Sequence, residues 1–294
     1  MTASRLGRIG AWGHLDSLSA PDALAYARRV EQLGFGTLWV PETVGREPFA
    51  LLGMLAQATT RMNLGTSIVN IWGRDAQAAC MGAETLAEAS AGRFVLGLGV
   101  SHPHLAEKLR GHTFERPLAA MRAYLAAYHA AIYRGPTADR SPPVLVAALR
   151  ERMTDLAATA TDGAFPYLVT AERIGWMRER LDAAAVGPRP ILAVTLPVAP
   201  VGDDAQEAAR AYLKPYLRTP TYQASWELQG FVPGDWEMPG SDRLVEAMIA
   251  TRGPDDARGR IDELIAAGAD HVAIIPIAPD GGTEHLPTLE ALGS

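Results

Sequence analysis

Short apolar runs alternate with amphipathic segments along most of the chain. Each apolar run has the length of a β-strand and stops at glycine, proline or a polar residue, and the segment after it has apolar residues at helical spacing. The expected strands are residues 8–12, 37–40, 63–70, 93–96, 143–147, 163–167, 191–196 and 271–276. The expected helices are residues 21–33, 48–60, 75–88, 116–133, 151–161, 171–185 and 204–217, with a further helical pair around Arg252-Gly253-Pro254.

This alternation predicts a parallel sheet whose strands are joined by helices. Eight such units in 294 residues favour a closed (β/α)8 TIM barrel. A doubly wound open sheet is the alternative, because periodicity does not reveal closure. No linker or low-complexity tract interrupts residues 1–294, so we expect one domain. The pattern is broken after the seventh strand by an irregular insertion at about residues 219–240, which is expected to be a lid, a subunit contact or a surface excursion.

The glycine-rich end of the fourth strand is the most distinctive local pattern. Gly97, Gly99 and Ser101 alternate with Leu98 and Val100. Small residues on one face of a strand end either let a large flat ligand approach the backbone or permit tight core packing, and the spacing leaves both interpretations open. The stretch is not a dinucleotide-binding GxGxxG motif, because the third glycine is missing.

Charge and composition narrow the class of protein. The formal net charge is −6 and no basic stripe occurs, so nucleic acid is not an expected partner. Cys80 is the single cysteine, so there is no internal disulfide. The first twelve residues lack the apolar core of a signal peptide, and no apolar run approaches the roughly 20 residues of a membrane span. We therefore expect a cytoplasmic protein with no membrane partner.

In a (β/α)8 barrel the active site lies at the carboxyl ends of the strands. These ends are poor in metal ligands and nucleophile motifs, so no metal site is expected. They are rich in aromatic, glycine and small polar residues, which suits an aromatic cofactor held by stacking and backbone hydrogen bonds. The positions are residues 12–14, 41–43, 67–70 with Trp72 and Arg74 beyond them, 99–102, 147–150, 166–167 and Pro276.

Several of these stretches carry a resemblance to a known family. Residues 37–42 (TLWVPE), 65–70 (GTSIVN), 91–102 (AGRFVLGLGVSH) and 117–128 (PLAAMRAYLAAY) resemble the bacterial-luciferase-like superfamily. Together with residues 45–49 (GREPF) and 109–112 (LRGH), they look like the actinobacterial oxidoreductases of this superfamily that use the deazaflavin coenzyme F420. The resemblance covers residues 8–133 best.

The resemblance implies a (β/α)8 barrel with a cofactor across its mouth and a non-proline cis peptide within residues 67–70. It also implies that the ends of strands two and four contact the cofactor, and that backbone amides after strands five and six hold its phosphate. The cofactor-binding residues expected on this basis are Trp12, Glu42, Ser67, Ile68, Val69, Asn70, Gly99, Val100, Ser101, Ala147, Ala148, Leu149, Arg150, Tyr167 and Thr170.

One position departs from the family pattern. Several relatives carry a histidine directly after the acidic residue that ends strand two, where it helps proton transfer, and this chain has Thr43 there. An acid or base must therefore come from another residue or from the substrate. The candidate catalytic residues are His14, Glu42 and His102.

The strand ends and the resemblance together leave three functions open. The first is hydride transfer between coenzyme F420 and a small, neutral or apolar organic substrate, although Arg46, Arg74 and Arg150 leave an anionic substrate open. The second is an FMN-dependent monooxygenase that uses oxygen, and the third is a barrel without cofactor that acts as a binding subunit. The residues expected to wall the substrate pocket are Trp12, Trp72, Trp226 and Trp236. The resemblance implies a homodimer.

Overall fold

The computed structural model describes residues 6–280 and 282–293, so residues 1–5 of the N-terminal segment lie outside it. The strand segments form one parallel sheet in the order β3-β2-β1-β9-β8-β7-β6-β5-β4, and a further pairing of β3 with β5 closes it into a barrel. The strands are β1 (Ile9–Trp12), β2 (Thr37–Val40), β3 (Asn63–Thr66), β4 (Val69–Asn70), β5 (Phe94–Gly99), β6 (Val144–Val146), β7 (Gly163–Ala164), β8 (Ile191–Val198) and β9 (His271–Pro276).

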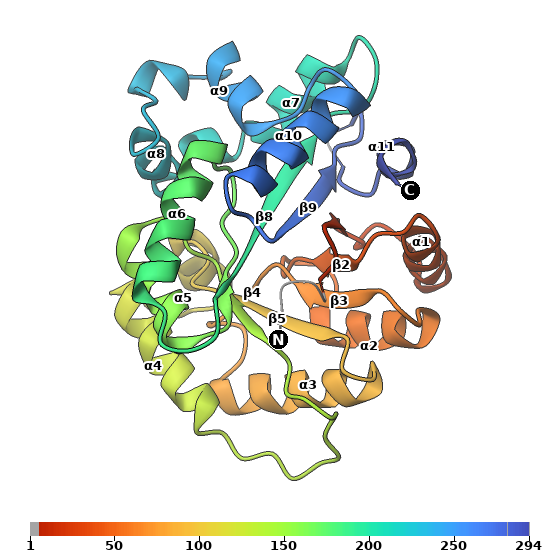
Figure 1. The fold of residues 1–294 in the computed structure, drawn as a ribbon, viewed down its shortest axis with the longest axis vertical. Helices are drawn as coiled ribbons and strands as arrows, with labels where there is room; N and C mark the ends of the chain where they lie inside the picture. Colours follow the sequence, from red (N-terminus) through yellow and green to blue (C-terminus); the bar gives the residue numbers. More distant parts are fainter. Residues whose placement is uncertain (1–5, 281, 294) are drawn as a thin grey trace.

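The closure confirms the (β/α)8 prediction and excludes the open sheet. Because β3 and β4 are two parts of one barrel strand, the sheet has eight strand positions. Helices surround it, and α7, α8 and α9 gather at the upper end in Figure 1. The α-helices are α1 (Ala20–Gln32), α2 (Pro48–Ala58), α3 (Ala76–Ala89), α4 (Pro117–His129), α5 (Glu151–Ala160), α6 (Ala171–Ala184), α7 (Ala205–Leu213), α8 (Pro220–Glu227), α9 (Asp242–Met248), α10 (Pro254–Ala266) and α11 (Leu286–Leu292).

Side-chain caps fix the point at which two loops of the barrel mouth enter their helices. The Glu47 carboxylate accepts a hydrogen bond from the Ala50 amide at the start of α2. The Asp75 carboxylate accepts one from the Ala78 amide at the start of α3. Each bond is 2.7 Å long and satisfies one of the amides that a helix start leaves unpaired. The loops after β2 and β4 therefore have defined ends.

The main differences between the structure and the predicted elements are as follows. The expected strand 63–70 is interrupted at Ser67–Ile68, although the apolar pattern continues through it. The expected strand 163–167 pairs only over Gly163–Ala164 before the chain leaves the sheet. The insertion, expected to be irregular, contains α8 and a short 3-10 turn, η4 (Pro233–Asp235). Helix α11 was not among the predicted elements.

The barrel interior is filled with side chains below its mouth. Trp39 of β2 is fully buried, and its ring centroid lies 4.7 Å from that of Phe165. The Trp39 indole donates a 2.9 Å hydrogen bond to Nε2 of His271, whose Nδ1 donates to the Gly7 carbonyl oxygen at 2.8 Å. A ligand can therefore enter only above this layer, at the carboxyl ends of the strands.

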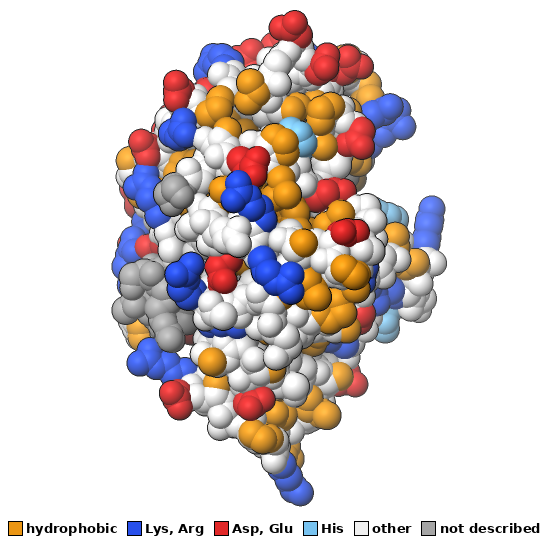
Figure 2. All heavy atoms as spheres, turned by 90° about the vertical axis from the view of Figure 1, so that its right-hand side faces the viewer, with side chains coloured by type: hydrophobic (Ala, Val, Ile, Leu, Met, Phe, Trp, Pro, Cys, Tyr) orange, Lys and Arg blue, Asp and Glu red, His pale blue; other side chains and the backbone are white. Residues whose placement is uncertain are grey.

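The outer surface mixes side chains of both charges. Acidic and basic groups are interspersed over the face in Figure 2, with hydrophobic side chains toward its middle. Large exposed hydrophobic residues such as Val44, Leu109 and Val186 come from different segments. In the part of the chain that the structure describes, every helix is too short or too polar to cross a membrane.

Candidate active site

A bulge between β3 and β4 forms one side of the barrel mouth. The Ser67–Ile68 peptide bond is cis, which confirms the non-proline cis peptide expected within residues 67–70. The Ser67 carbonyl oxygen accepts a 3.0 Å hydrogen bond from the Trp12 indole, and the Ser67 amide donates to the Val40 carbonyl oxygen at 2.8 Å. The Ile68 carbonyl oxygen accepts from the Glu42 amide at 3.2 Å. The bulge is thus tied to both β1 and β2.

The glycines of β5 make room for this bulge. A Cβ atom at Gly97 would lie 2.0 Å from the Thr66 carbonyl oxygen, and a Cβ atom at Gly99 would lie 2.5 Å from Ile68 Cδ1. Of the two interpretations of the glycine pattern, tight packing therefore applies to Gly97. At Gly99 the bulge side chain packs against the backbone, and the residue also faces the cavity described next.

A cavity of about 540 Å³ opens at the carboxyl ends of the strands. It is mainly apolar, with a few polar groups facing inward, as ligand pockets usually are. Most of the predicted site residues line it. These are Trp12, His14, Glu42, Ser67, Ile68, Gly99, Val100, Ser101, His102, Ala147, Ala148, Leu149, Arg150 and Tyr167.

Three of the predicted cofactor-binding residues lie outside this lining. Val69 is fully buried in the core around the barrel. The Asn70 side chain is bonded to the Glu42 carboxylate at 2.6 Å. The Thr170 hydroxyl caps α6, and its amide donates a 2.8 Å hydrogen bond to Oε1 of Gln229. The Thr170 amide is therefore already occupied and does not suit the predicted phosphate contact.

Three of the four tryptophans predicted to wall the pocket also lie outside its lining. Trp72 points away along the loop after β4, where its indole donates to the Val100 carbonyl oxygen at 2.8 Å. Trp226 of α8 is fully buried and donates to the Leu168 carbonyl oxygen at 3.3 Å. Trp236 packs against Trp226, with ring centroids 6.4 Å apart. Only Trp12 lines the cavity as predicted.

Tyrosines take the place of these tryptophans. Tyr216 lies in a 3-10 turn, η3 (Tyr216–Arg218), and Tyr222 lies in α8, and both line the cavity. Their ring centroids are 5.2 Å apart, and the ring centroid of Tyr167 lies 5.3 Å from that of Tyr216 and 5.6 Å from that of Tyr222. The Tyr167 and Tyr212 hydroxyls are 2.5 Å apart. The start of the insertion therefore roofs the cavity. In the sequence, Tyr216 and Tyr222 are only two aromatic residues near the start of the insertion, and their spacing did not mark them as cavity residues.

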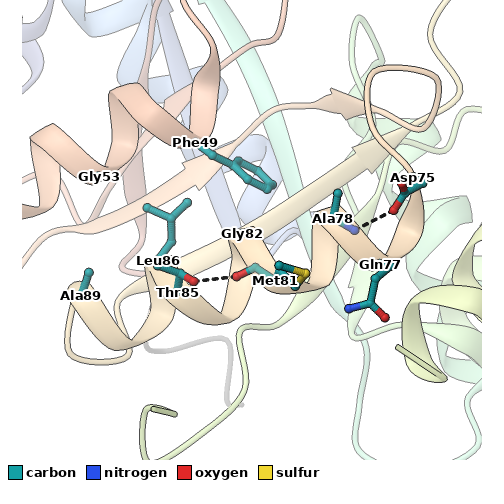
Figure 3. Close-up of a pocket in the computed structure, with 10 residues that line it drawn as sticks. All are labelled: Phe49, Gly53, Asp75, Gln77, Ala78, Met81, Gly82, Thr85, Leu86 and Ala89. Atoms are coloured by element: carbon teal, nitrogen blue, oxygen red, sulfur yellow. Dashed lines mark hydrogen bonds between the residues drawn. The ribbon is translucent and has the colours of Figure 1, made fainter. Parts of the chain in front are cut away.

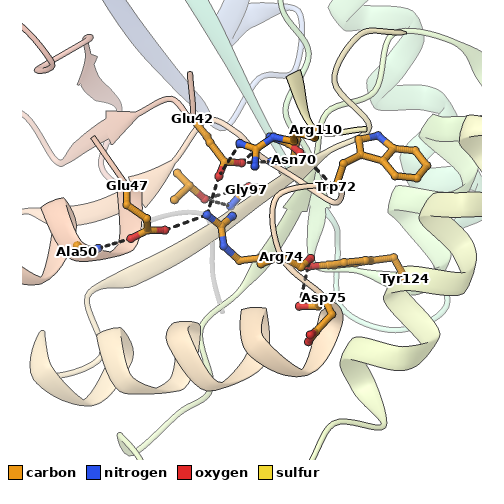
Figure 4. Close-up of polar contacts among 11 residues, drawn as sticks. Glu42, Glu47, Ala50, Asn70, Trp72, Arg74, Asp75, Gly97, Arg110 and Tyr124 are labelled. Atoms are coloured by element: carbon orange, nitrogen blue, oxygen red, sulfur yellow. Dashed lines mark hydrogen bonds and ion pairs between the residues drawn. The ribbon is translucent and has the colours of Figure 1, made fainter. Parts of the chain in front are cut away.

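Glu42 lies at the centre of a buried charge network (Figure 4). Its side chain is 5% exposed and accepts hydrogen bonds from the Asn70 amide at 2.8 Å and from Arg74 at 2.6 Å. Arg110 approaches to 3.4 Å, and Arg74 also contacts Glu47 at 2.9 Å. Both carboxylate oxygens are therefore occupied, Oε2 by Asn70 and Oε1 by the two guanidinium groups. Glu42 is therefore better described as the anchor of the bulge than as a catalytic residue.

The two candidate histidines face the cavity from different strands. Burial lowers the pKa of His14, and the charges of Asp16 and Glu284 oppose this shift. Burial, and then the neighbouring His104, lower the pKa of His102. The His102 ring is stacked 6.0 Å from that of His104, and its Nδ1 is buried without a hydrogen-bond partner. Both imidazoles are therefore neutral near pH 7, and His102 has an unused polar atom at the site.

The start of α5 offers the clearest place for an anion. A short loop, residues 147–150, joins β6 to this helix, and Arg150 at the N-cap position makes no side-chain capping bond. Amides at a helix start attract anions, and the Arg150 guanidinium adds a positive charge. Ala148, Leu149 and Arg150 line the cavity at this point. Apolar walls, the bulge and an anion site together fit a flat cofactor that carries a phosphate.

A second hollow lies on the outer surface, between α2 and α3 (Figure 3). It is a shallow, mostly apolar groove in which Phe49 points at Gly82. A Cβ atom at Gly82 would lie 2.3 Å from the Phe49 ring, so this glycine serves helix packing. The groove is remote from the strand ends and lacks converging polar groups. Among the described residues, no group of three or more His, Cys, Asp or Glu side chains could hold a metal ion.

The fold and the cavity define a TIM barrel with a ligand site at the carboxyl ends of its strands. The chain belongs to the luciferase-like monooxygenase family, whose sequence model matches residues 4–271. This confirms the resemblance noted from the motifs.

Individual relatives are more distant. A Mycobacterium tuberculosis protein named as a coenzyme F420-dependent oxidoreductase is 27% identical over 71% of this chain and 70% of its own. The 5,10-methylenetetrahydromethanopterin reductase of Methanolobus tindarius is 25% identical over 87% and 90%. An F420-dependent secondary alcohol dehydrogenase, solved with an F420-acetone adduct, matches with a TM-score of 0.76 at 14% identity, covering 97% of this chain and 99% of that one. The structural match supports the fold alone.

Proposed function

We propose that this protein is an oxidoreductase that transfers a hydride between coenzyme F420 and a small, uncharged organic substrate. The observation that carries the proposal is the cavity at the barrel mouth, with the Ser67–Ile68 bulge on one side and the start of α5 beside it. The F420-dependent relatives favour the deazaflavin. When bound, the cofactor supplies a carbon that accepts or donates the hydride.

The residues of this chain would hold the cofactor and exclude water. Trp12, Ile68 and Gly99 form the apolar surface for its ring system. Ala148 to Arg150 would hold its phosphate through the amides at the start of α5. The tyrosine roof limits the access of water, which strengthens polar interactions inside the site.

Titration of the protein with F420 and, separately, with FMN tests this proposal through fluorescence and absorbance. Saturable micromolar binding of F420, with much weaker binding of FMN, is expected. A preference for FMN would favour the second candidate, an oxygen-using monooxygenase. This candidate is supported by the description of the family as monooxygenases. Binding of neither cofactor would contradict both enzymatic functions and leave a barrel that serves as a binding subunit.

His102 is the residue that we propose for proton transfer with the substrate. Its neutral imidazole at pH 7 can accept a proton from a substrate hydroxyl, through the unpartnered Nδ1. We expect His102→Asn to lower kcat for alcohol oxidation by about 100-fold without changing the F420 Kd. The wild-type rate should fall as the pH drops through the lowered pKa. An equal loss in His14→Asn, or no loss in His102→Asn, would assign the role elsewhere.

The family resemblance also leads us to propose a homodimer. Light scattering coupled to size-exclusion chromatography tests this directly. A mass twice that of the 31.4 kDa chain is expected, and a monomer mass at micromolar concentration would contradict it.

A further inference from the structure

The hydroxyl of Thr195 is a polar group that the fold leaves without a partner. The residue lies in β8, its side chain faces the cavity, and it is 5% exposed. Its Oγ1 is buried and makes no hydrogen bond to any described residue. A buried hydroxyl without a partner destabilises the fold, because it has lost its bonds to water and gained none in return. Because Thr195 lines a ligand cavity, a ligand atom that reaches this oxygen can supply the missing bond.

Thr195 lies across the barrel from the bulge. Starting at the β3/β4 strand, β8 is the fourth strand position through β2, β1 and β9, and also the fourth through β5, β6 and β7. In an eight-stranded barrel this is the opposite wall. A flat ring that rests on Ile68 therefore presents its other face toward the Thr195 side, where the second reactant must lie.

The wall around Thr195 carries no charged side chain among the described residues that line the cavity. The strands on either side of β8 contribute to the cavity lining only uncharged residues, which are Ile275 of β9 and residues 165–167 after β7, and the roof residues Tyr216 and Tyr222 carry no charge either. Burial raises the pKa of both tyrosines above the usual value, so their phenols are neutral near pH 7. The positively charged side chain of Arg150 lies at the start of α5, in the anion site, and not on this wall. A phosphate or carboxylate on this side would be desolvated without a counter-charge.

From this arrangement we propose that Thr195 is the specificity-determining residue for the substrate, and that its hydroxyl binds the neutral oxygen of a ketone or of the corresponding secondary alcohol. The inference rests on the proposed function, because that function identifies the ring on the opposite wall as the deazaflavin ring of F420. It predicts that uncharged carbonyl compounds bind and that carboxylates of the same size do not.

The test compares the wild type with Thr195→Val, which keeps the shape but removes the hydroxyl, and with Thr195→Ser, which restores it. Binding of cyclohexanone and of cyclohexanecarboxylate is measured by saturation-transfer NMR, first on the free protein and then with F420 added. We expect cyclohexanone to bind the wild type and Thr195→Ser within twofold of each other, and Thr195→Val about fivefold more weakly. Cyclohexanecarboxylate should bind at least tenfold more weakly than the ketone.

Two further readouts separate specificity from structure. The unfolding midpoint of Thr195→Val should equal or exceed that of the wild type, because an unpaired buried hydroxyl has been removed. The F420 Kd should be the same in all three proteins within twofold. Equal ketone binding by wild type and Thr195→Val, or carboxylate binding as tight as ketone binding, would overturn the inference even if F420 binds. Failure of F420 to bind would instead contradict the proposed function, while the ketone measurements on the free protein still decide the role of Thr195.

Discussion

His271 shows how one buried side chain can make the stability of the barrel depend on pH. It accepts a hydrogen bond from Trp39 and donates one to the Gly7 carbonyl oxygen, so only the neutral imidazole fits. Burial lowers its pKa to about 4 from an unfolded value near 6.5. Between pH 4 and pH 6.5 the imidazole of His271 is therefore protonated in the unfolded chain but not in the folded protein. The stabilisation is complete above pH 6.5 and is lost as the pH falls toward 4.

We expect His271 to account for a loss of about 3 kcal/mol in unfolding free energy between pH 7 and pH 4. Urea unfolding of wild type and His271→Gln at several pH values measures this, since glutamine can accept from Trp39 and donate to Gly7 without titrating. The pH dependence common to both proteins arises from other groups. Parallel stability curves for the two proteins would show that His271 does not titrate as described.

Glu42 illustrates a residue whose contacts hold the bulge beside the cavity in place. Glu42→Gln leaves Arg74, whose side chain is 12% exposed, with only the exposed Glu47 as a counter-charge. We expect a loss of about 2 kcal/mol in unfolding free energy, together with weaker F420 binding because the bulge loses its anchor. Chemical denaturation and F420 titration measure the two effects.

Glu47→Gln is the matched control for Glu42. Its carboxylate side chain is 52% exposed, and glutamine can still cap α2, so the change should cost less than about 1 kcal/mol. Equal losses in the two variants would mean that burial of the network contributes little. Unchanged F420 binding in Glu42→Gln would show that the bulge does not depend on this anchor.

At the scale of elements, the packing of β5 against the bulge separates two glycines that look alike in the sequence. Gly97→Ala should cost about 3 kcal/mol or more, because its Cβ would meet backbone at 2.0 Å, which cannot move alone. Gly99→Ala should cost about 1 kcal/mol, because the Ile68 side chain that it meets can change rotamer. Urea unfolding measures both losses.

The same two variants, Gly97→Ala and Gly99→Ala, also distinguish a residue that serves packing from one that contacts the ligand. The altered Ile68 position in Gly99→Ala should raise the F420 Kd, although the protein stays folded. A similar stability loss in both variants would contradict the distinction drawn between the two positions. An unchanged F420 Kd in Gly99→Ala would mean that this strand end does not contact the cofactor.

The element order was predictable, whereas the irregular parts of the site were not. Alternating apolar and amphipathic segments indicate the strands and helices, because each must bury one face. The apolar pattern runs unbroken through Ser67 and Ile68, so periodicity alone could not show the bulge, and the family motifs were needed. In the insertion, tryptophan was expected at the pocket, but Trp226 fills the core under α8 and Tyr222 faces the cavity. Which aromatic faces inward depends on tertiary packing.

At the scale of the whole molecule, the insertion and the β7–α6 loop form one connected unit. The Trp226 indole donates to the Leu168 carbonyl oxygen, and Gln229 accepts from the Thr170 amide while donating to Ser225. We expect Gln229→Ala to raise the F420 Kd about fivefold, because the loop that follows Tyr167 loses a bond worth about 1 kcal/mol. F420 fluorescence titration measures this change.

Gln223→Ala, in α8 six residues before Gln229, provides the comparison. Its side chain donates to the Leu217 carbonyl oxygen, within the roof itself, and does not reach the β7–α6 loop. Its F420 Kd should stay within twofold of the wild type, while its unfolding midpoint should shift about as much as that of Gln229→Ala. Equal effects on F420 binding would show that the roof acts on the cofactor only through general stability.

This connection constrains how new specificities can arise in the fold. In most barrels a loop after one strand can be exchanged with little effect on the next, so substrate choice and cofactor affinity can change separately. Here the segment that roofs the cavity is also bonded to the loop before α6. A grafted insertion from a relative would therefore need its own partners for Leu168 and Thr170. Laboratory evolution of the substrate range should accordingly yield paired changes in the insertion and in this loop rather than changes in either one alone.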